Sequence, residues 1–245
     1  IISKLGYTNK NTKKAVDFFP FPELCTMNLV IDIGNTLIKY AVFENRRMVY
    51  DQVSESGLFL SKIKELFEHY PKINYAIISS VGKLDKTEKD IVSLFCKVHV
   101  LSSASKVPFK NSYATPHTLG VDRLALATAA FYQNPRGNTL AIDAGTCITY
   151  DMVNNAGEYV GGAISPGVRM RYKAMHNQTV GLPLLEPEEL LDFVGNSTQS
   201  CMHSGVINGV ACEVDGVIDQ YRARYQDLTV ILTGGDAHFF AKRLK

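Results

Sequence analysis

Residues 29–39 read Leu-Val-Ile-Asp-Ile-Gly-Asn-Thr-Leu-Ile-Lys, and residues 140–150 read Leu-Ala-Ile-Asp-Ala-Gly-Thr-Cys-Ile-Thr-Tyr. Each run begins as an apolar strand, reaches an aspartate, turns through a glycine with a threonine close by, and then returns to strand character. Because Asp32 and Asp143 hold the same place in the two runs, the sequence predicts an internal duplication of an α/β unit. Two similar lobes are therefore expected.

Strands and helices are predicted to alternate around these two runs. Short apolar runs bounded by turn residues predict strands at residues 48–53, 73–81, 98–101 and 228–232. Apolar residues at intervals of three or four predict helices over residues 58–70, 85–97, 121–132, 168–176, 186–194, 197–225 and the start of 237–245. In the second of these helices, Ile91, Leu94 and Phe95 should face inward. In the helix over 197–225, the buried stripe should consist of Val206, Val210, Val214, Val217 and Tyr221.

The composition is that of an ordinary globular protein, with 245 residues, of which 46% are hydrophobic and 20% charged. The formal net charge is +2, and without a long basic run this excludes the broad positive surface of a nucleic-acid binder and favours a small-molecule partner. The five cysteines include no Cys-x-x-Cys pair and fit neither a disulfide framework nor a zinc site. No apolar run approaches the roughly 18 residues of a membrane-spanning helix, so we expect a cytoplasmic protein that does not enter a membrane.

The two ends of the chain differ from the rest. Residues 1–26 begin without methionine and are rich in Lys, Asn and Thr, whereas Met27 stands directly before the first strong strand. We expect residues 1–26 to be an extension that need not be native, and Met27 to be the true start. The helical pattern of residues 237–245 stops without a capping glycine, which predicts a truncated C-terminal lobe.

Both turns have the chemistry needed to hold phosphate. A strand that ends in a tight turn exposes backbone N–H groups, and threonine hydroxyls beside them add donors for phosphate oxygens. An acidic residue that opens such a turn repels phosphate unless a cation lies between, so Asp32 and Asp143 imply Mg²⁺ bound partly through water. Lys39 is placed to add a positive charge. One such turn alone is more often ordinary, but its repetition in a duplicated unit favours a phosphate site.

Further motifs follow in an order that is specific to one family. They lie at residues 32–39, 120–123 (with Tyr113 and Pro116 upstream), 143–149, 161–167, 179–183, 195–198 and 233–236. In this order they resemble the motifs of type III pantothenate kinases, and the likeness runs from Met27 to the C-terminus. The resemblance implies a duplicated ribonuclease H-like (actin-like ATPase) α/β fold, with lobes at residues 27–118 and 119–245 and a central cleft.

The resemblance also implies a function. The expected reaction is the ATP-dependent phosphorylation of pantothenate to 4'-phosphopantothenate, the first step of coenzyme A biosynthesis. The implied partners are ATP, Mg²⁺, a monovalent cation (K⁺ or NH₄⁺) and a second copy of the chain in a homodimer.

Roles for individual residues follow from the same likeness. Asp122 matches the general base of the family, Asp143 matches the residue associated with the monovalent cation, and Asp32 would bind Mg²⁺ through water. The implied substrate-binding residues are Tyr113, Gly120, Val121, Asp122, Arg123 and Thr198. The implied ATP- and phosphate-binding residues are Asp32, Gly34, Asn35, Thr36, Lys39, Gly145, Thr146, Thr149, Gly234 and Gly235.

Taken without the resemblance, several of these residues have simpler interpretations. Asp122 at the start of a helix is typical of an N-terminal cap, in which case Arg123 would form a surface ion pair. Thr198 also fits a helix cap, and Thr149 fits ordinary strand propensity.

Two alternative functions stay open at this point. Another small-molecule kinase of the actin-like fold would share both turns, and the segment at 120–123 opposes that interpretation. A regulatory, non-catalytic homologue would keep the fold alone. The presence of Asp32, Lys39, Asp122 and Asp143 opposes it, because a site without a reaction has no need of converging charges.

Overall fold

The computed structural model describes residues 27–34, 37–45, 47–80, 86–189 and 192–244. The chain divides into two compact units. Unit 1 comprises the described residues up to Lys106 together with His117–Leu124, and unit 2 comprises Val107–Pro116 together with the described residues from Ala125 onward. Residues 1–26, for which an extension is predicted, lie outside the described residues.

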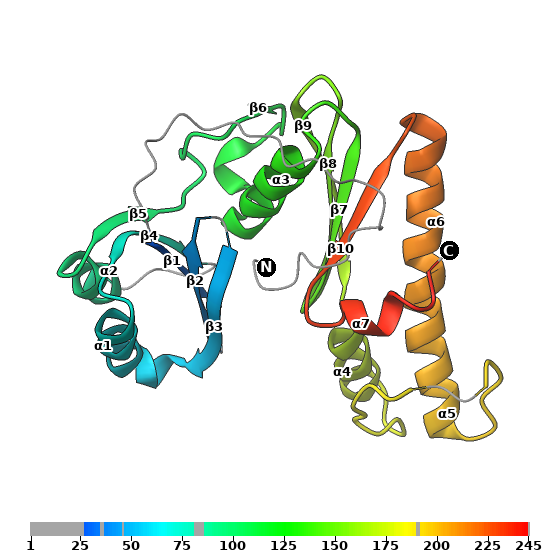
Figure 1. The fold of residues 1–245 in the computed structure, drawn as a ribbon. Helices are drawn as coiled ribbons and strands as arrows, with labels where there is room; N and C mark the ends of the chain where they lie inside the picture. The colour runs from blue at the N-terminus through cyan, green and yellow to red at the C-terminus, as the bar shows by residue number, and fades with distance from the viewer. Residues whose placement is uncertain (1–26, 35–36, 46, 81–85, 190–191, 245) are drawn as a thin grey trace. The chain divides into compact units, whose positions relative to one another are not determined.

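Unit 1 is built on a five-stranded mixed sheet with the strand order β3-β2-β1-β4-β5 (Figure 1). β1 (Met27–Ile33), β2 (Leu37–Glu44) and β3 (Arg47–Glu55) form antiparallel pairs, while β4 (Ile73–Ser80) lies parallel to β1 and β5 (Lys97–Val100) lies parallel to β4. A 3-10 turn at Ser56–Leu58 and α1 (Phe59–His69) connect β3 to β4, and α2 (Lys86–Ser93) connects β4 to β5. Helices occupy these connections because parallel strands need long crossovers.

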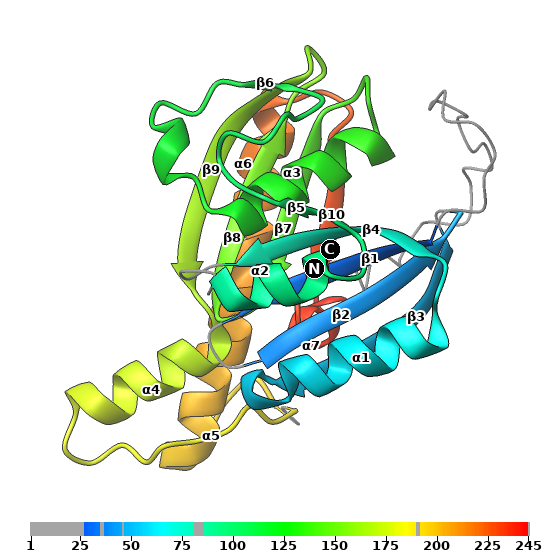
Figure 2. The same ribbon diagram turned by 90° about the vertical axis from the view of Figure 1, so that its left-hand side faces the viewer.

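The core of unit 1 lies on one face of its sheet, where α1 and α2 are side by side (Figure 2). Leu29, Ile31 and Ile38 alternate along β1 and β2 and are completely buried in a cluster that also contains Ile63 of α1. Residues between them project from the opposite face, because successive side chains of a strand alternate. The burial of the apolar set therefore directs Asp32 away from this core.

Unit 2 contains a second five-stranded sheet, with the order β10-β7-β8-β9-β6. β7 (Thr139–Ala144), β8 (Cys147–Val153) and β9 (Glu158–Pro166) form antiparallel pairs, β10 (Thr229–Thr233) lies parallel to β7, and β6 (Lys110–Asn111) lies parallel to β9. The helices are α4 (Val168–Gln178), α5 (Thr198–His203), α6 (Gly209–Arg224), α7 (Ala237–Phe240) and most of α3 (Val121–Gln133). The start of α3, up to Leu124, belongs to unit 1, and a 3-10 turn at Pro116–Thr118 precedes it.

The long helical segment of unit 2 carries the predicted apolar stripe. Val206, Val210 and Val214 are buried in the main cluster of the unit, and Val217 and Tyr221 are partly buried against it. Between α5 and α6, Ser204–Asn208 forms a π-helical turn, so the segment contains one wide turn.

The other face of the second sheet is covered by α3, which lies on the side opposite to α6 (Figure 1). Phe131 of α3 contacts Phe109, with ring centroids 6.3 Å apart, and Phe109 contacts Tyr159 of β9 at 5.9 Å. Both faces of this sheet are therefore covered by helices of the chain.

The two sheets confirm the predicted duplication. The order β3-β2-β1-β4 in unit 1 corresponds to β9-β8-β7-β10 in unit 2, with the same antiparallel and parallel pairings. The fifth strands differ, since β5 lies beside β4 whereas β6 lies beside β9. Four strands with this order and direction, twice over, give the duplicated ribonuclease H-like α/β fold expected from the sequence.

Two local predictions are wrong. Residues 186–189 and 192–194 are not helical, although a helix over residues 186–194 is predicted from the sequence. In the second helix of unit 1, α2 ends at Ser93, so Val92 is buried while Leu94 is 82% exposed. Phe95 is 45% exposed and stacks on Phe67, with ring centroids 4.6 Å apart.

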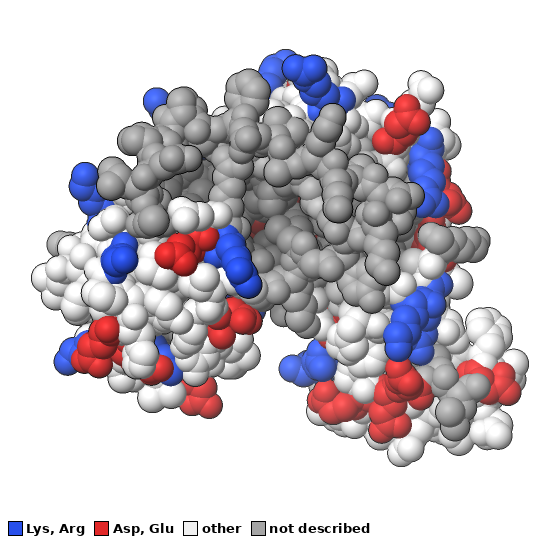
Figure 3. Space-filling view, in the orientation of Figure 1, with Lys and Arg blue, Asp and Glu red and all other residues white. Residues whose placement is uncertain are grey.

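The surface shows no continuous field of one charge on the face drawn in Figure 3, where basic and acidic side chains of the described residues are interspersed. In the part of the chain that the structure describes, no helix has the length and hydropathy needed to cross a membrane.

Candidate functional site

The first aspartate turn links β1 to β2 in unit 1. Asp32 and Lys39 are opposite each other in the antiparallel pair, with Lys39 Nζ 3.8 Å from Asp32 Oδ2. The backbone N–H of Gly34 donates to the carbonyl of Leu37 at 3.1 Å. Half of the Lys39 side chain is exposed, against a fifth of the Asp32 side chain, so the ammonium group remains accessible to an anion. Asn35 and Thr36 lie outside the described residues.

The second aspartate turn, residues 143–147, links β7 to β8 in unit 2. The backbone N–H of Gly145 donates to the carbonyl of Cys147 at 3.0 Å, which closes the turn. Thr149 is opposite Asp143 across the antiparallel pair, so the side chains of the two residues project from the same face. Thr146 is exposed at the tip. The sequence-predicted residues Asp143, Gly145, Thr146 and Thr149 are therefore gathered at one end of the sheet.

Two glycines bring other segments against the backbone of this turn. A Cβ on Gly167 would lie 2.2 Å from the carbonyl oxygen of Gly145, and a Cβ on Gly234 would lie 2.3 Å from that of Ala144. Gly234 also has a φ of +101°, which disfavours any residue with a side chain. At Gly235 a Cβ would meet no described atom within 4 Å. The result is a backbone cradle, in which the segments at Gly167 and Gly234 pack directly on the carbonyls of the second turn and fix its position.

An ion pair ties the cradle together. The backbone N–H of Asp236 donates to the carbonyl of Ala144 at 2.9 Å, and the Asp236 carboxylate accepts a 2.8 Å hydrogen bond from Arg169 in the first turn of α4. The Asp236 side chain is 6% exposed and that of Arg169 55%. Arg169 also lies 3.4 Å from Glu186. Asp236 thus links two segments: its buried carboxylate binds α4, and its backbone N–H binds the second turn.

The start of α3 places Asp122 and Arg123 in unit 1. Asp122 Oδ1 accepts the backbone N–H of Arg123 at 2.9 Å, and a Cβ on Gly120 would lie 2.4 Å from that same oxygen. The carboxylate therefore folds over the first turn of the helix, above a glycine that leaves it room. Arg123 is 6% exposed, so the alternative of a surface ion pair for Arg123 is wrong.

Tyr113 lies in unit 2, against β9. Its backbone N–H donates to Asn111 Oδ1 at 3.1 Å, and its ring lies 3.1 Å from where a Cβ of Gly161 would be. Gly161 has a φ of +93°. A side chain at this position would displace the ring, so Gly161 allows the tyrosine to lie flat on the strand.

Thr198 begins α5 and lines an open groove of about 810 Å³ in unit 2. The groove is lined by Met175, Leu182, Gly195, Asn196, Ser197, Thr198, Cys201, Met202 and Gly205. The helix is capped by Ser197, whose side chain accepts the backbone N–H of Ser200. Since the preceding residue provides the cap, capping does not account for Thr198.

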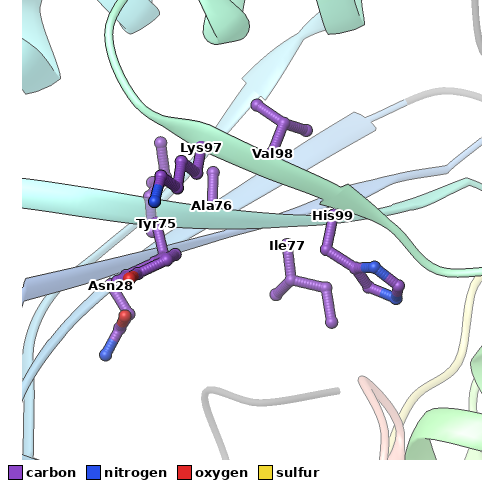
Figure 4. A pocket seen from close by; sticks show the side chains of 8 residues that line it. Asn28, Tyr75, Ala76, Ile77, Lys97, Val98 and His99 are labelled. Atoms are coloured by element: carbon purple, nitrogen blue, oxygen red, sulfur yellow. The ribbon is translucent and has the colours of Figure 1, made fainter. Parts of the chain in front are cut away.

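A smaller cavity of about 330 Å³ lies on the sheet of unit 1. Ile77 and His99 project from one side of their strands and Val98 from the other (Figure 4). Lys97 Nζ lies 5.8 Å from the centroid of the Tyr75 ring. None of the sequence-predicted site residues lines this cavity, so it is separate from the aspartate turns.

The described residues at the two turns offer no cluster of side-chain ligands for a metal ion. Within the described ranges, no group of three or more His, Cys, Asp or Glu side chains is arranged to hold a metal ion. A cation at either turn would therefore depend on one carboxylate, backbone oxygens, water and the ligand itself.

Comparison with known proteins decides the family. The sequence model of the family described as type III pantothenate kinase matches residues 28–220. The chain belongs to the type III pantothenate kinase family.

Several relatives with this name are similar over nearly the whole chain. The type III pantothenate kinase of Flavobacterium johnsoniae is 45% identical over 219 residues, covering 89% of this chain and 90% of that protein. The one from Flavobacterium psychrophilum is 46% identical, with 89% and 91% covered, and the one from Bacteroides fragilis is 40% identical, with 89% and 90% covered.

A solved structure shares the fold. The crystal structure of a protein described as a conserved putative Baf family transcriptional activator from Campylobacter jejuni has a TM-score of 0.58 at 21% identity, covering 89% of this chain and 88% of that one. At this identity the likeness concerns the fold alone.

For this member of the pantothenate kinase family, the structure adds residues that sequence reasoning missed. Arg169 and Asp236 pair across the second turn, but they are far apart in sequence and lie in segments noted for their glycines. The sequence signal that could have found them is a charged residue close to a glycine in each segment: Arg169 follows Gly167-Val168, and Asp236 follows Gly235. Pairing them required knowledge that both segments reach the same turn.

Proposed function

We propose that this chain transfers the γ-phosphoryl group of ATP to the primary hydroxyl of pantothenate, giving 4'-phosphopantothenate and ADP. The observation that carries the proposal is the backbone cradle at the second turn, where Gly167 and Gly234 press against the carbonyls of residues 144–146. The cradle fixes the turn that carries Asp143 and the exposed Thr146, and it occurs in a chain of the type III pantothenate kinase family.

On the nucleotide side, the work of the chain is to bind and orient. The exposed Thr146 hydroxyl would donate to phosphate oxygens, since the N–H groups of Gly34 and Gly145 already donate to carbonyls within their turns. Lys39 would add a positive charge at the first turn, where its ammonium group is half exposed. Gly234 and Gly235 would leave room for the adenosine. Mg²⁺ at Asp32 and a monovalent cation at Asp143 would neutralise phosphate charge.

On the acceptor side, Asp122 would orient the hydroxyl of pantothenate and accept its proton as the new P–O bond forms and the bond to ADP breaks. The hydroxyl proton leaves late in such reactions, so the carboxylate does not need a raised pKa to act. Arg123 suits a carboxylate or amide of the acceptor, and Tyr113 offers a flat amphipathic wall. Thr198 would contact the acceptor from the groove.

A homodimer is part of the proposal. Val180, Phe193 and Val194 of unit 2 are highly exposed, with 109%, 70% and 71% relative exposure. Exposed apolar side chains of this size would supply apolar area to an association site. A second copy of the chain covering them would form a symmetric pair.

The reaction is tested by measuring ADP release from ATP, with and without pantothenate and with and without K⁺, for three proteins. We expect pantothenate-dependent ADP release by the wild type and a loss of about 100-fold or more in kcat for Asp122→Asn. Asparagine still accepts the backbone N–H of Arg123, so the helix keeps its start. Asp219→Asn, at an exposed carboxylate of α6, is the matched control and should keep full activity.

Two outcomes would contradict the proposal at different points. Wild-type protein that releases no ADP in response to pantothenate would remove the proposed function. Equal activity of the wild type and Asp122→Asn would leave the function standing and remove the role of Asp122.

A further inference from the structure

In each unit, a buried hydroxyl without a hydrogen-bond partner lies beside the motif aspartate. Thr233, the last residue of β10, is the Cα partner of Asp143, and Ser79 of β4 is the Cα partner of Asp32. Among the described residues, neither Thr233 Oγ1 nor Ser79 Oγ finds a partner. Most buried hydroxyls in proteins are paired. An exception that recurs at the same place in a duplicated unit indicates a shared use.

The Thr233 hydroxyl is positioned toward the cradle. Leu232 packs on the main cluster of unit 2, so Thr233 projects from the other face of β10, as Asp143 does from β7. Thr233 is 1% exposed. The carboxylate of Asp143 reaches over Gly234, the residue after β10, since a Cβ on Gly234 would lie 2.4 Å from Asp143 Oδ1. The hydroxyl and the carboxylate thus lie beside the same glycine.

The same row exists in unit 1. Lys39, Asp32 and Ser79 are consecutive partners across β2, β1 and β4, as Thr149, Asp143 and Thr233 are across β8, β7 and β10. In both rows the aspartate is in the middle and a hydroxyl is on the parallel strand. Only the third member differs, being a lysine in one unit and a threonine in the other.

We propose that the Thr233 hydroxyl is a positioning group for the phosphate chain of the bound nucleotide, donating a hydrogen bond to it directly or through one water, and that Ser79 does the same at the first turn. The inference rests on the proposed function and deepens it. It explains why a strand end that is otherwise apolar keeps a hydroxyl on the side of the cradle. The hydroxyl gains in the nucleotide complex the partner that the protein alone does not supply.

The chain contains its own control. Thr139, the first residue of β7, is also 1% exposed with an unpartnered Oγ1, and it projects from the same face as Asp143. It stands four residues from Asp143, about 13 Å along the strand. Valine has nearly the shape of threonine, so Thr233→Val and Thr139→Val each remove one unpartnered hydroxyl. Only the first lies at the cradle.

The experiment measures, by calorimetry, the dissociation constants of two ligands from the protein: the non-hydrolysable ATP analogue AMP-PNP in the presence of Mg²⁺, and adenosine. The Tm of each protein without ligand is measured as well. We expect Thr233→Val and Ser79→Ala each to weaken AMP-PNP binding by roughly three- to tenfold. Thr233→Val should leave adenosine binding unchanged, and its Tm should equal or exceed that of the wild type, because a buried unpartnered group is lost. Thr233→Ser should bind AMP-PNP like the wild type, and so should Thr139→Val.

The outcomes separate this inference from the proposed function. Wild-type protein that binds no nucleotide overturns both. Wild-type protein that binds AMP-PNP, with Thr233→Val binding it equally well, overturns the inference alone. If Thr233→Val weakens the binding of AMP-PNP and of adenosine equally, the inference is also overturned, since the effect would then be structural. The same holds if Thr139→Val weakens AMP-PNP binding as much as Thr233→Val does. Unchanged binding by Ser79→Ala overturns its extension to the first turn.

Discussion

Replacing Arg169 by alanine removes the partner of a carboxylate that is almost completely buried. An exposed ion pair contributes about 0–1 kcal/mol, whereas breaking a buried pair costs about 3–5 kcal/mol. The Asp236 side chain is 6% exposed and the Arg169 side chain 55%, so this pair lies between the two limits. We expect Arg169→Ala to lower the free energy of unfolding by about 2 kcal/mol, which corresponds to about 4–8 °C in Tm for a chain of this size.

The same change should affect the nucleotide more than the chemical step. Asp236 is hydrogen bonded through its backbone to Ala144, so loss of its side-chain partner loosens the segment that carries Gly234 against the second turn. We expect the KM for ATP to rise about tenfold, a change of about 1.4 kcal/mol, with a smaller change in kcat. Steady-state kinetics with varied ATP, together with thermal unfolding followed by circular dichroism, measure both effects.

A matched variant controls for the loss of a surface arginine. Arg222 of α6 has a similarly exposed side chain, at 49%, and lies 3.7 Å from an exposed Asp219. Arg222→Ala should therefore cost less than about 1 kcal/mol and leave the KM for ATP unchanged. If the two variants lower Tm by the same amount, or if Arg169→Ala keeps the wild-type KM, the reasoning about the buried carboxylate is refuted.

Two further predictions concern unit 2. Gly234→Ala should destabilise the protein by roughly 1–3 kcal/mol and abolish the rise in Tm caused by ATP, because its Cβ would collide with Ala144. Gly216→Ala, in α6, is the control: a Cβ there meets nothing within 4 Å, so it should keep that rise, and similar behaviour of the two variants would refute the reasoning. Burial alone would raise the pKa of Glu213, but hydrogen bonds from Ser165 and Arg171 and the charge of Arg171 outweigh it and hold the pKa below the ordinary value of a glutamate. This stabilisation is present above the unfolded-state pKa and is lost as the pH falls through the folded-state pKa. Urea unfolding between pH 7 and pH 3 should therefore show a weaker acid loss of stability for Glu213→Gln than for the wild type, and parallel curves would contradict the assignment.

The strands of both sheets could be predicted from the sequence, because the alternation of apolar residues and the residue preferences of turns are local properties. Leu29, Ile31 and Ile38 alternate as buried strands require, and the glycines after Asp32 and Asp143 mark the turns. The helix expected over residues 186–194 failed because short apolar spacing also occurs in loops that pack on a surface. The inward position of Leu94 failed because the helix ended before the pattern did.

The site was predictable as a set of segments, and less so as a set of contacts. The second turn gathers Asp143, Gly145, Thr146 and Thr149 because they are close in sequence. The pair between Arg169 and Asp236 and the hydroxyl of Thr233 depend on β10 lying parallel to β7, which is a long-range pairing. Strand order of this kind follows from the whole topology, and no local pattern records it.

The wide turn at Ser204–Asn208 divides the long helical segment into two parts with different angular phase. One residue of a helix corresponds to about 100° of rotation. The extra residue accommodated there lets α5 present Thr198 to the groove while α6 keeps Val210 and Val214 against the sheet. Loss of a single residue at this point would rotate Thr198 around the helix axis and leave the valine stripe in place. The length of this short stretch therefore determines whether Thr198 faces the groove.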